Sequence, residues 1–244
     1  GIPANLAAAG TIAVEDWNND DLMDVLVSRA GAAPLLIEKI RGGPLAATNA
    51  ETAWSKGQIF AAGDLNNDLR ADLVVLSDRQ LSISFGGLKE TKTIAMPEGA
   101  VTSIVLIDYD NDGWLDICTV GDGVHLYRNV GDAGFADQTA ALGLDAVKGP
   151  IAEVHFADFD QDGDSDFLVA PASGDLQLWR NDGGNSNHQL KVRLMGNRSN
   201  ASGIGVKVEC RAGGLRNTRT ISKLPVEIGV GKYEQLDAVT VHWF

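Results

Sequence analysis

The chain repeats one acidic stretch of nine residues four times. The copies begin at residues 16, 64, 108 and 158, so successive starts are 48, 44 and 50 residues apart. They read DWNNDDLMD (loop one, 16–24), DLNNDLRAD (loop two, 64–72), DYDNDGWLD (loop three, 108–116) and DFDQDGDSD (loop four, 158–166). A repeat of roughly 20–50 residues indicates copies of one supersecondary unit that pack against each other, so this spacing limits the possible folds more than any other feature.

Short apolar segments flank every acidic stretch. TIAV, QIFAAG, SIVLI and EVHFA precede the four loops, and VLV, LVVL, ICTV and FLVA follow them. These segments are rich in β-branched or aromatic residues and are bounded by turn residues, which predicts a strand on each side of each loop. Further strands are expected at LSISF (81–85), VHLYR (124–128) and LQLWR (176–180).

Units of this length with about four short strands are typical of the blades of a β-propeller. A β-sandwich is the alternative, but a sandwich does not need the same acidic loop once per unit. Propellers have about four to eight blades. We therefore expect an all-β chain that holds a partial β-propeller of about four blades, followed by a small β-sandwich-like C-terminal domain.

The charge changes sign along the chain. Residues 1–186 hold 11 Lys/Arg and 29 Asp/Glu, whereas residues 187–244 hold 9 and 4. This shift predicts two domains, 1–186 and 187–244. The formal net charge of −13 argues against a nucleic-acid partner, because nucleic acid is a polyanion. No apolar run approaches the roughly 20 residues that a membrane-spanning helix needs.

The acidic loops have the composition of a metal site. Alternate side chains of a tightly curled loop can converge, and every group offered here is an oxygen, which suits Ca²⁺ better than Mg²⁺. No His or Cys recurs in the loops, which argues against zinc or copper. The expected ligands are the side chains at positions 1, 3, 5 and 9 and the carbonyl at position 7: Asp16, Asn18, Asp20, Leu22, Asp24; Asp64, Asn66, Asp68, Arg70, Asp72; Asp108, Asp110, Asp112, Trp114, Asp116; Asp158, Asp160, Asp162, Asp164, Asp166.

The loops have two other possible interpretations. An EF-hand needs a carboxylate at position 12 and flanking helices, but position 12 is Val or Thr and the flanks are predicted strands. A plain polar turn can be built from Asp, Asn and Gly. It does not require the four loops to hold 16 of the 33 acidic residues, whose mutual repulsion favours a bound cation.

The four loops are not expected to bind calcium equally. Position 6 needs a positive φ, which Gly113 and Gly163 adopt freely, Asp21 tolerates and Leu69 should resist. Loops one and two also carry a neutral Asn at position 3. Up to four Ca²⁺ are predicted, with loops three and four the strongest and loop two the weakest.

No catalytic motif stands out, and the chain is expected to be non-enzymatic. The four histidines are scattered without metal-ligand or triad spacing, and no nucleophile elbow, HExxH or P-loop occurs. Cys118 and Cys210 are predicted to be buried free thiols.

These residues give the chain a resemblance to a known family. The four units resemble the FG-GAP/VCBS repeats of integrin-like β-propellers. DYDNDGWLD with the following VHLYRNVGDAGFADQTAALGL is similar to the repeat of the cartilage acidic protein family and its bacterial relatives. An ASPIC/UnbV domain often follows the propeller in that family, and both NHQLKVRLMGNRSNASGIGVKVEC (187–210) and LPVEIGVGKYEQLDAVTVHWF (224–244) resemble parts of it.

The resemblance implies a calcium-bearing, exported propeller. We expect an extracellular, cell-surface or periplasmic module, stabilised by calcium, that binds a protein or carbohydrate ligand in adhesion or structural assembly. Two alternatives stay open: an enzyme or enzyme scaffold with its site on the propeller face, and a subunit of an extracellular filament or larger assembly.

Overall fold

The protein is described from a computed structural model that covers residues 9–29, 32–50, 59–77, 79–86, 90–197 and 200–243. These residues form twenty β-strands and three short 3-10 helices, and every strand pairing is antiparallel. The expectation of an all-β chain is confirmed. Within the described residues, no helix is long and apolar enough to cross a membrane.

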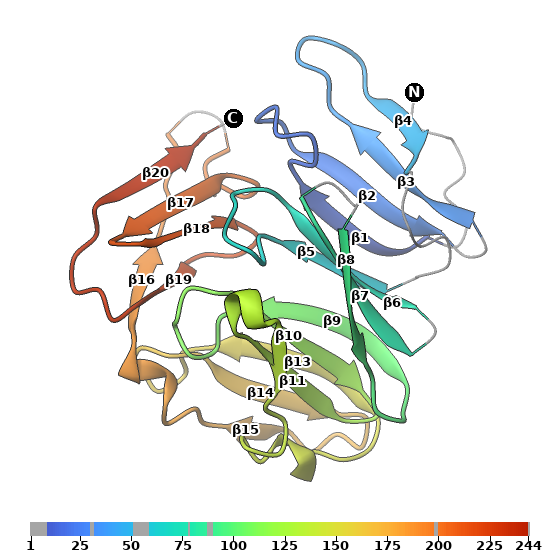
Figure 1. Cartoon of the computed structure of the whole chain (residues 1–244), viewed down its shortest axis with the longest axis vertical. Coiled ribbons are helices and arrows are strands. Elements are labelled where there is room, and N and C mark those ends of the chain that lie inside the picture. Colours follow the sequence, from blue (N-terminus) through green and yellow to red (C-terminus); the bar gives the residue numbers. More distant parts are fainter. Residues whose placement is uncertain are drawn as a thin grey trace.

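Each acidic repeat forms one sheet whose strands follow chain order (Figure 1). The first two sheets are β1(Ala9–Glu15), β2(Asp24–Arg29), β3(Ala32–Glu38), β4(Ala46–Asn49) and β5(Ile59–Gly63), β6(Asp72–Ser77), β7(Gln80–Phe85), β8(Glu90–Ala95). The next two are β9(Val101–Ile107), β10(Asp116–Gly121), β11(Val124–Asn129), β12(Phe135–Asp137) and β13(Ile151–Ala157), β14(Asp166–Pro171), β15(Gln177–Trp179). The strands predicted from the apolar segments are confirmed.

The register is the same at every acidic loop. Each loop joins the first and second strands of its sheet, and position 9 begins the second strand. That residue pairs with the residue immediately before position 1, as in Glu15–Asp24 and Ile107–Asp116. The apolar strands on both sides thus place the four loops at equivalent points of their sheets.

Apolar side chains fill the spaces between successive sheets. Leu26 of β2 packs in one cluster with Phe60 and Leu73 of the second sheet. A second cluster joins the second and third sheets, and a third joins the third and fourth sheets, where Phe167 and Val169 pack with residues of β10 and β11. The first strands also lie side by side, β1 next to β5 and β5 next to β9.

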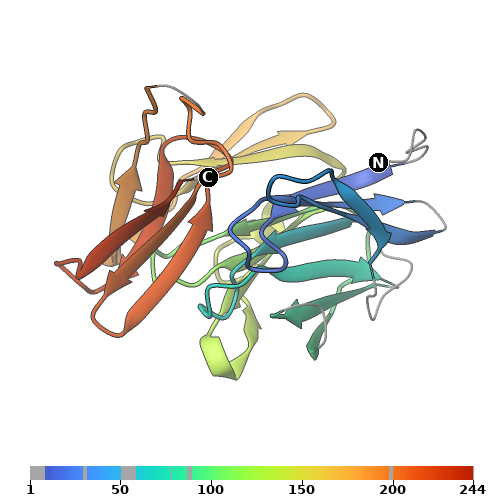
Figure 2. The same cartoon turned by 90° about the horizontal axis from the view of Figure 1, so that it is seen from above.

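The remaining strands form two small sheets with their own core. β16(His188–Val192) pairs with β19(Val226–Gly231), and β17(Lys207–Ala212) lies between β18(Leu215–Thr220) and β20(Ala238–His242). Val206, Val208, Cys210, Ile221, Ile228 and Val230 fill the space between these sheets. Figure 2 shows them standing beside the sheets of the repeats. The three 3-10 helices are η1(Gly131–Ala133), η2(Leu144–Ala146) and η3(Gly184–Ser186), and η3 lies just before the predicted boundary at residue 187.

Candidate metal centre

Two left-handed residues curl each acidic loop. Position 4 has a φ between 56° and 65° in Asn19, Asn67, Asn111 and Gln161. Position 6 is left-handed too, at 65° in Asp21, 73° in Leu69, 92° in Gly113 and 101° in Gly163. Leu69 therefore makes the bend that its side chain disfavours, at a cost of about 1–2 kcal/mol. The sequence indicated the bend at position 6 and missed the one at position 4.

The carboxylate at position 1 holds the curl closed. One of its oxygens accepts the backbone N–H of position 6 in every loop: Asp21 to Asp16 at 3.0 Å, Leu69 to Asp64 at 2.9 Å, Gly113 to Asp108 at 3.1 Å and Gly163 to Asp158 at 3.2 Å. The other oxygen behaves differently. In loops one and two it accepts the N–H of position 5, from Asp20 at 3.0 Å and Asp68 at 3.1 Å.

In loops three and four that second oxygen has no partner. Oδ1 of Asp108 and Oδ1 of Asp158 are buried and accept no hydrogen bond. The two side chains are only 5% and 3% exposed. A buried carboxylate oxygen without a partner is costly, so each of these atoms is a candidate contact for a cation or a hydrogen-bond donor.

Loops three and four also hold the two acidic clusters that could bind a metal ion among the described residues. In loop three, one oxygen from each of Asp108, Asp110 and Asp112 lies within 4.8 Å of the others. In loop four the corresponding group is Asp158, Asp160 and Asp166. Hard oxygen donors at this spacing fit Ca²⁺. Position 9 thus joins the cluster in loop four, whereas position 5 joins it in loop three.

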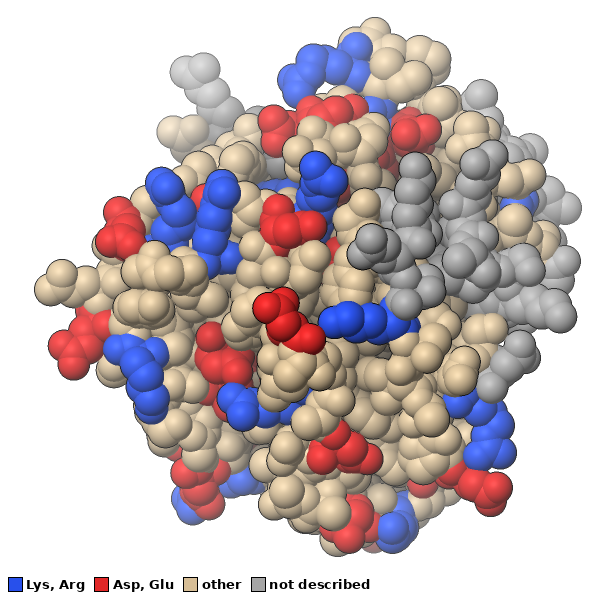
Figure 3. All heavy atoms as spheres, in the orientation of Figure 1, with Lys and Arg blue, Asp and Glu red and all other residues tan. Residues whose placement is uncertain are grey.

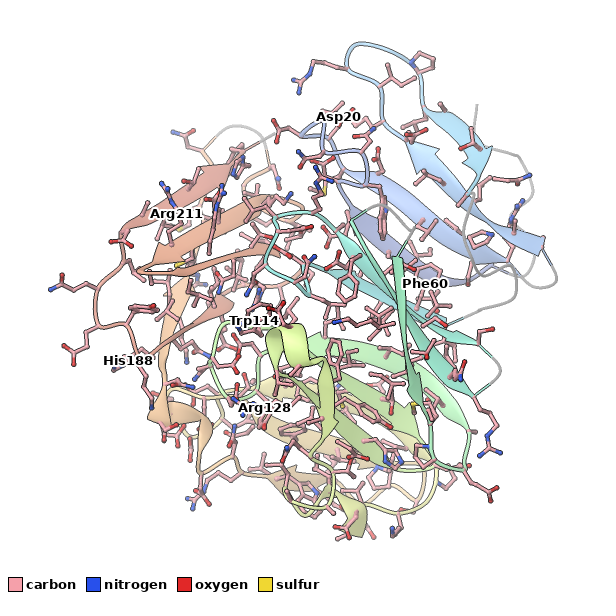
Figure 4. The ribbon with its side chains drawn as sticks, in the orientation of Figure 1. Asp20, Phe60, Trp114, Arg128, His188 and Arg211 are labelled. Atoms are coloured by element: carbon pink, nitrogen blue, oxygen red, sulfur yellow. The ribbon has the colours of Figure 1, made fainter. Side chains whose placement is uncertain are left out.

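Position 7 is fixed by the side chain at position 5. The N–H groups of Leu22, Arg70 and Trp114 donate to Asp20, Asp68 and Asp112 at 2.9 Å, and that of Asp164 donates to Asp162 at 3.3 Å. This bond fixes the peptide that immediately precedes the carbonyl predicted as a ligand. Figure 4 shows Trp114 of loop three in the same region as Arg128, with Asp20 of loop one away from both.

Position 9 has a structural role that the sequence did not indicate. Each position 9 carboxylate is buried and accepts two backbone N–H groups, one from position 2 of its loop and one from the strand end beyond. The donors and distances are Trp17 (3.3 Å) and Lys39 (2.9 Å) for Asp24; Leu65 (2.7 Å) and Gly86 (2.8 Å) for Asp72; Tyr109 (3.2 Å) and Asn129 (2.7 Å) for Asp116; Phe159 (2.9 Å) and Asn181 (2.8 Å) for Asp166.

Burial and mutual repulsion raise the pKa values of several loop carboxyls. Burial raises the pKa of Asp108 to about 7, against the opposing effect of Arg219, and Asp112 and Asp110 add to the rise. Burial likewise raises the pKa of Asp72 to about 7 and that of Asp116 well above its usual range. Burial is the largest cause of each shift, and neighbouring carboxylates of the same loop add to it in loop two and in loop three.

Cationic side chains compensate part of this charge. Arg128 forms ion pairs with Asp110 at 2.6 Å and with Asp112 at 2.9 Å. In loop four, burial acts to raise the pKa of Asp158, but an ion pair with Lys191 outweighs it and lowers that pKa. On the face in Figure 3, acidic and basic side chains are interspersed rather than gathered into one patch.

Two asparagines that the sequence analysis overlooked join successive repeats. Asn129 donates from Nδ2 to the carbonyl of Leu65 at 2.7 Å, at position 2 of the preceding loop, and to Leu115 of its own loop at 3.0 Å. Asn181 makes the equivalent bonds to Tyr109 at 2.8 Å and Ser165 at 3.4 Å. The shared signal is an aromatic-Arg-Asn tripeptide at 127–129 and 179–181.

Comparison with protein families agrees with the repeat found in the sequence. Residues 64–119 and 108–169 match the FG-GAP-like repeat. The matches begin at Asp64 and Asp108, the first residues of loops two and three, and the second match includes loop four. The chain thus contains FG-GAP-like repeats, which occur in β-rich binding modules and are typical of extracellular proteins. A search among curated proteins found no match to this chain.

Proposed function

We propose that the chain is a calcium-binding β-propeller module, stabilised by the metal and acting outside the cytoplasm. The observation that carries this proposal is the pair of buried, unpartnered oxygens on Asp108 and Asp158, each inside a cluster of three carboxylates. The donor set is all oxygen, as Ca²⁺ prefers. When bound, the ion would supply the positive charge that these clusters lack.

The proposed residues of the two strongest sites follow from the clusters. In loop three they are the carboxylates of Asp108, Asp110, Asp112 and Asp116, together with the backbone carbonyl of Trp114. In loop four, Asp158, Asp160 and Asp166 are joined by Asp162 and the carbonyl of Asp164. Loops one and two are weaker candidates, because their position 3 is a neutral Asn and their position 1 carboxylate has no unpartnered oxygen.

The propeller is proposed from the order of the sheets. Four sheets follow each other along the chain, each with its acidic loop between its first two strands, and apolar clusters fill the spaces between neighbours. This arrangement supports about four propeller blades. The two facing sheets of β16–β20 support the proposed C-terminal domain at 187–244, which resembles an ASPIC/UnbV domain.

The location and partners are proposed from the expected calcium affinity and from the FG-GAP-like repeats. Extracellular calcium modules bind in the range of roughly 0.1–1 mM, and cytosolic calcium does not fill such sites. The typical setting of FG-GAP-like repeats agrees with a secreted or cell-surface protein. We propose a protein or carbohydrate ligand, or neighbouring segments of a larger assembly, as the partner in adhesion.

Calcium titration of matched variants tests the proposal. Isothermal titration calorimetry of the calcium-free protein should give two strong sites. Asp108→Asn and Asp158→Asn should each remove one of them, because each change neutralises the unpartnered carboxylate. Asp16→Asn and Asp64→Asn change the same position of the weaker loops and should leave both strong sites. Absence of calcium binding at 1 mM, or equal losses in all four variants, would refute it.

A second candidate, an enzyme or small-molecule site, is favoured by one observation. A cavity of about 730 Å³ lies between the first strands of the repeats and the C-terminal sheets, and Glu15 lines it. Burial raises the pKa of Glu15 to about 7. Ligand-observed NMR with mixtures of sugars and small amines tests this candidate. Binding that Glu15→Gln abolishes and the exposed control Glu234→Gln retains would support it, and no binding would refute it.

A further inference from the structure

The C-terminal sheets enclose the backbone of loop three. Three carbonyls of the loop accept hydrogen bonds from this region: that of Asp110 from Asn187 Nδ2 at 2.7 Å, that of Asn111 from the Gly231 N–H at 2.9 Å, and that of Gly113 from Asn217 Nδ2 at 3.2 Å. Gln189 also donates to the Asn111 side chain at 3.0 Å. Positions 3, 4 and 6 are therefore held from outside the repeat.

Loop three packs tightly against β18 and β19. A Cβ atom on Gly229 of β19 would lie 2.2 Å from Asp108 Oδ2, and one on Gly113 would lie 2.5 Å from Leu215 of β18. The Cβ on Gly229 would also lie 2.6 Å from the backbone of Asn111, so β19 packs against loop three at a distance that only glycine allows. At Gly113 the nearest atom is the end of the Leu215 side chain, which would have to shift.

A buried ion pair adds a charge connection. Nη2 of Arg219 lies 3.3 Å from Oδ2 of Asp108, and the two side chains are 9% and 5% exposed. This pair uses the oxygen of Asp108 that also accepts the Gly113 N–H, and it leaves Oδ1 without a partner. Arg219 and a metal ion can therefore engage different oxygens of the same carboxylate.

The other loops make fewer contacts with this region. Thr218 donates to Asp64 of loop two at 3.1 Å, and Lys191 pairs with Asp158 of loop four. Thr220 donates to Glu15, next to loop one, at 2.7 Å. Loop three alone has the carbonyls of three of its positions held in this way among the described hydrogen bonds.

We propose that cation binding at loop three and docking of residues 187–243 on the repeats are coupled, so that each strengthens the other. This inference rests on the proposed calcium site. The carbonyls held by the C-terminal region belong to positions 3, 4 and 6, whereas the proposed carbonyl ligand is at position 7, so both sets of bonds can exist together. Docking fixes the curl of the loop in advance, which lowers the ordering cost of binding. By linkage, the same free energy then strengthens docking when the metal is bound.

Hydrogen exchange of the full chain tests the coupling. Calcium should slow amide exchange in β17, β18 and β19 by about fivefold or more, the lower end of typical coupling between sites. Asp110→Asn should abolish that protection, because it removes a proposed ligand of loop three. Its counterpart in loop four, Asp160→Asn, should retain most of it.

A reciprocal pair of variants measures the coupling from the other side. Asn187→Ala should weaken calcium binding at loop three about threefold to tenfold, within the usual range of coupling. Asn185→Ala is the matched control, because Asn185 lies two residues earlier and donates to Asp162 of loop four at 2.8 Å. It should affect loop four and spare loop three.

The outcomes separate the inference from the proposed function. If calcium binds and Asp110→Asn removes one site, but exchange in β17–β19 is unchanged by calcium, the coupling is overturned and the calcium module stands. Equal effects of Asn187→Ala and Asn185→Ala on loop three would also overturn it. If the wild-type chain binds no calcium, the inference and the proposed function fail together.

Discussion

At position 1, loops three and four differ from loops one and two in one oxygen atom, although all four loops share the same bend. Position 1 of loops one and two has both oxygens engaged by backbone N–H groups, whereas position 1 of loops three and four has one buried oxygen free. The neutral Asn at position 3 in the first pair is replaced by Asp in the second. The first pair is therefore closed by hydrogen bonds of the chain itself, and we propose that a cation completes the second pair.

The comparison separates two roles within one repeated motif. Position 9 and one oxygen of position 1 hold the backbone in every loop. The other oxygen of position 1 and the residue at position 3 differ between the loops: the oxygen in its hydrogen bonding, and position 3 in its charge. A motif of this kind can keep its fold where its metal site is weaker, as we propose for the first pair.

The largest expected effect is that of calcium on thermal stability. At 100 times its dissociation constant, a bound ion stabilises the folded chain by about 2.7 kcal/mol, and two such sites give about 5 kcal/mol. For a chain of this size, this corresponds to a rise in Tm of about 10–20 °C over the same protein in a chelator. Differential scanning calorimetry in calcium and in EGTA measures the shift.

Variants of single loops show how much of the rise in Tm comes from loops three and four and how much from loops one and two. Asp108→Asn should remove about half of the rise in Tm, and Asp64→Asn almost none of it. Magnesium at equal concentration controls for general salt effects. A loss of similar size in both variants would mean that the free oxygen does not distinguish the loops.

The next largest effect is expected at position 9, where the two pairs should behave alike. Asp116→Ala and Asp72→Ala each leave two backbone N–H groups without an acceptor, at about 1–3 kcal/mol per group. We expect a loss of about 4 kcal/mol in the free energy of unfolding for either variant, measured by urea denaturation in EGTA. A loss in Asp72→Ala much smaller than that in Asp116→Ala would show that the first pair is not held by position 9.

The strands of the repeats could be predicted because local sequence determines them. SIVLI and ICTV are β-branched segments on either side of a turn, and they form β9 and β10 in the expected hairpin. The repeat also predicted which loop positions are alike. It could not reveal that Asp116 binds the N–H groups of Tyr109 and Asn129, since a carboxylate at position 9 fits a metal ligand and a backbone acceptor equally well.

The contacts between distant segments lay beyond sequence reasoning for a physical reason. The carbonyls of Asp110 and Gly113 accept bonds from residues about 77 and 104 positions later in the chain. No local pattern encodes such pairs, because they depend on how the two sheets of β16–β20 lie against the repeats. The aromatic-Arg-Asn tripeptide was visible, but only the bonds of Asn129 and Asn181 explain it.

A third prediction compares the two glycines at position 6 of the second pair. Gly163 has open space where a Cβ would lie, so Gly163→Ala should cost only the positive-φ strain, about 1–2 kcal/mol. Gly113→Ala adds a clash with Leu215 and should cost about 3 kcal/mol. Urea denaturation gives both values, and hydrogen exchange should show loosening of β18 in Gly113→Ala alone. Equal costs would mean that the C-terminal sheets yield easily at loop three.

The smallest expected effect is a pH dependence beside loop one. The pKa of Glu15 is about 7 in the folded chain, above its value of 4.5 in a free side chain, because burial disfavours the carboxylate. Below pH 4.5 the residue is protonated in both states and has no effect. Between pH 4.5 and 7 the unfolded chain loses the proton first, so stability falls as the pH rises.

Glu15→Gln should remove this fall while keeping an acceptor for the Thr220 hydroxyl. The full shift corresponds to about 3 kcal/mol, but the side chain is half-buried at the edge of the cavity, so we expect the variant to be about 1–2 kcal/mol more stable than wild type at pH 8 and equal to it at pH 4. Urea denaturation across this pH range in EGTA measures the difference. Glu15 precedes loop one and is not among the proposed ligands, so calcium binding by the Glu15→Gln variant should equal that of the wild type. This control separates the pH dependence of the fold from that of metal binding in loops three and four. A difference that is constant from pH 4 to pH 8 would assign the effect to packing rather than to proton binding.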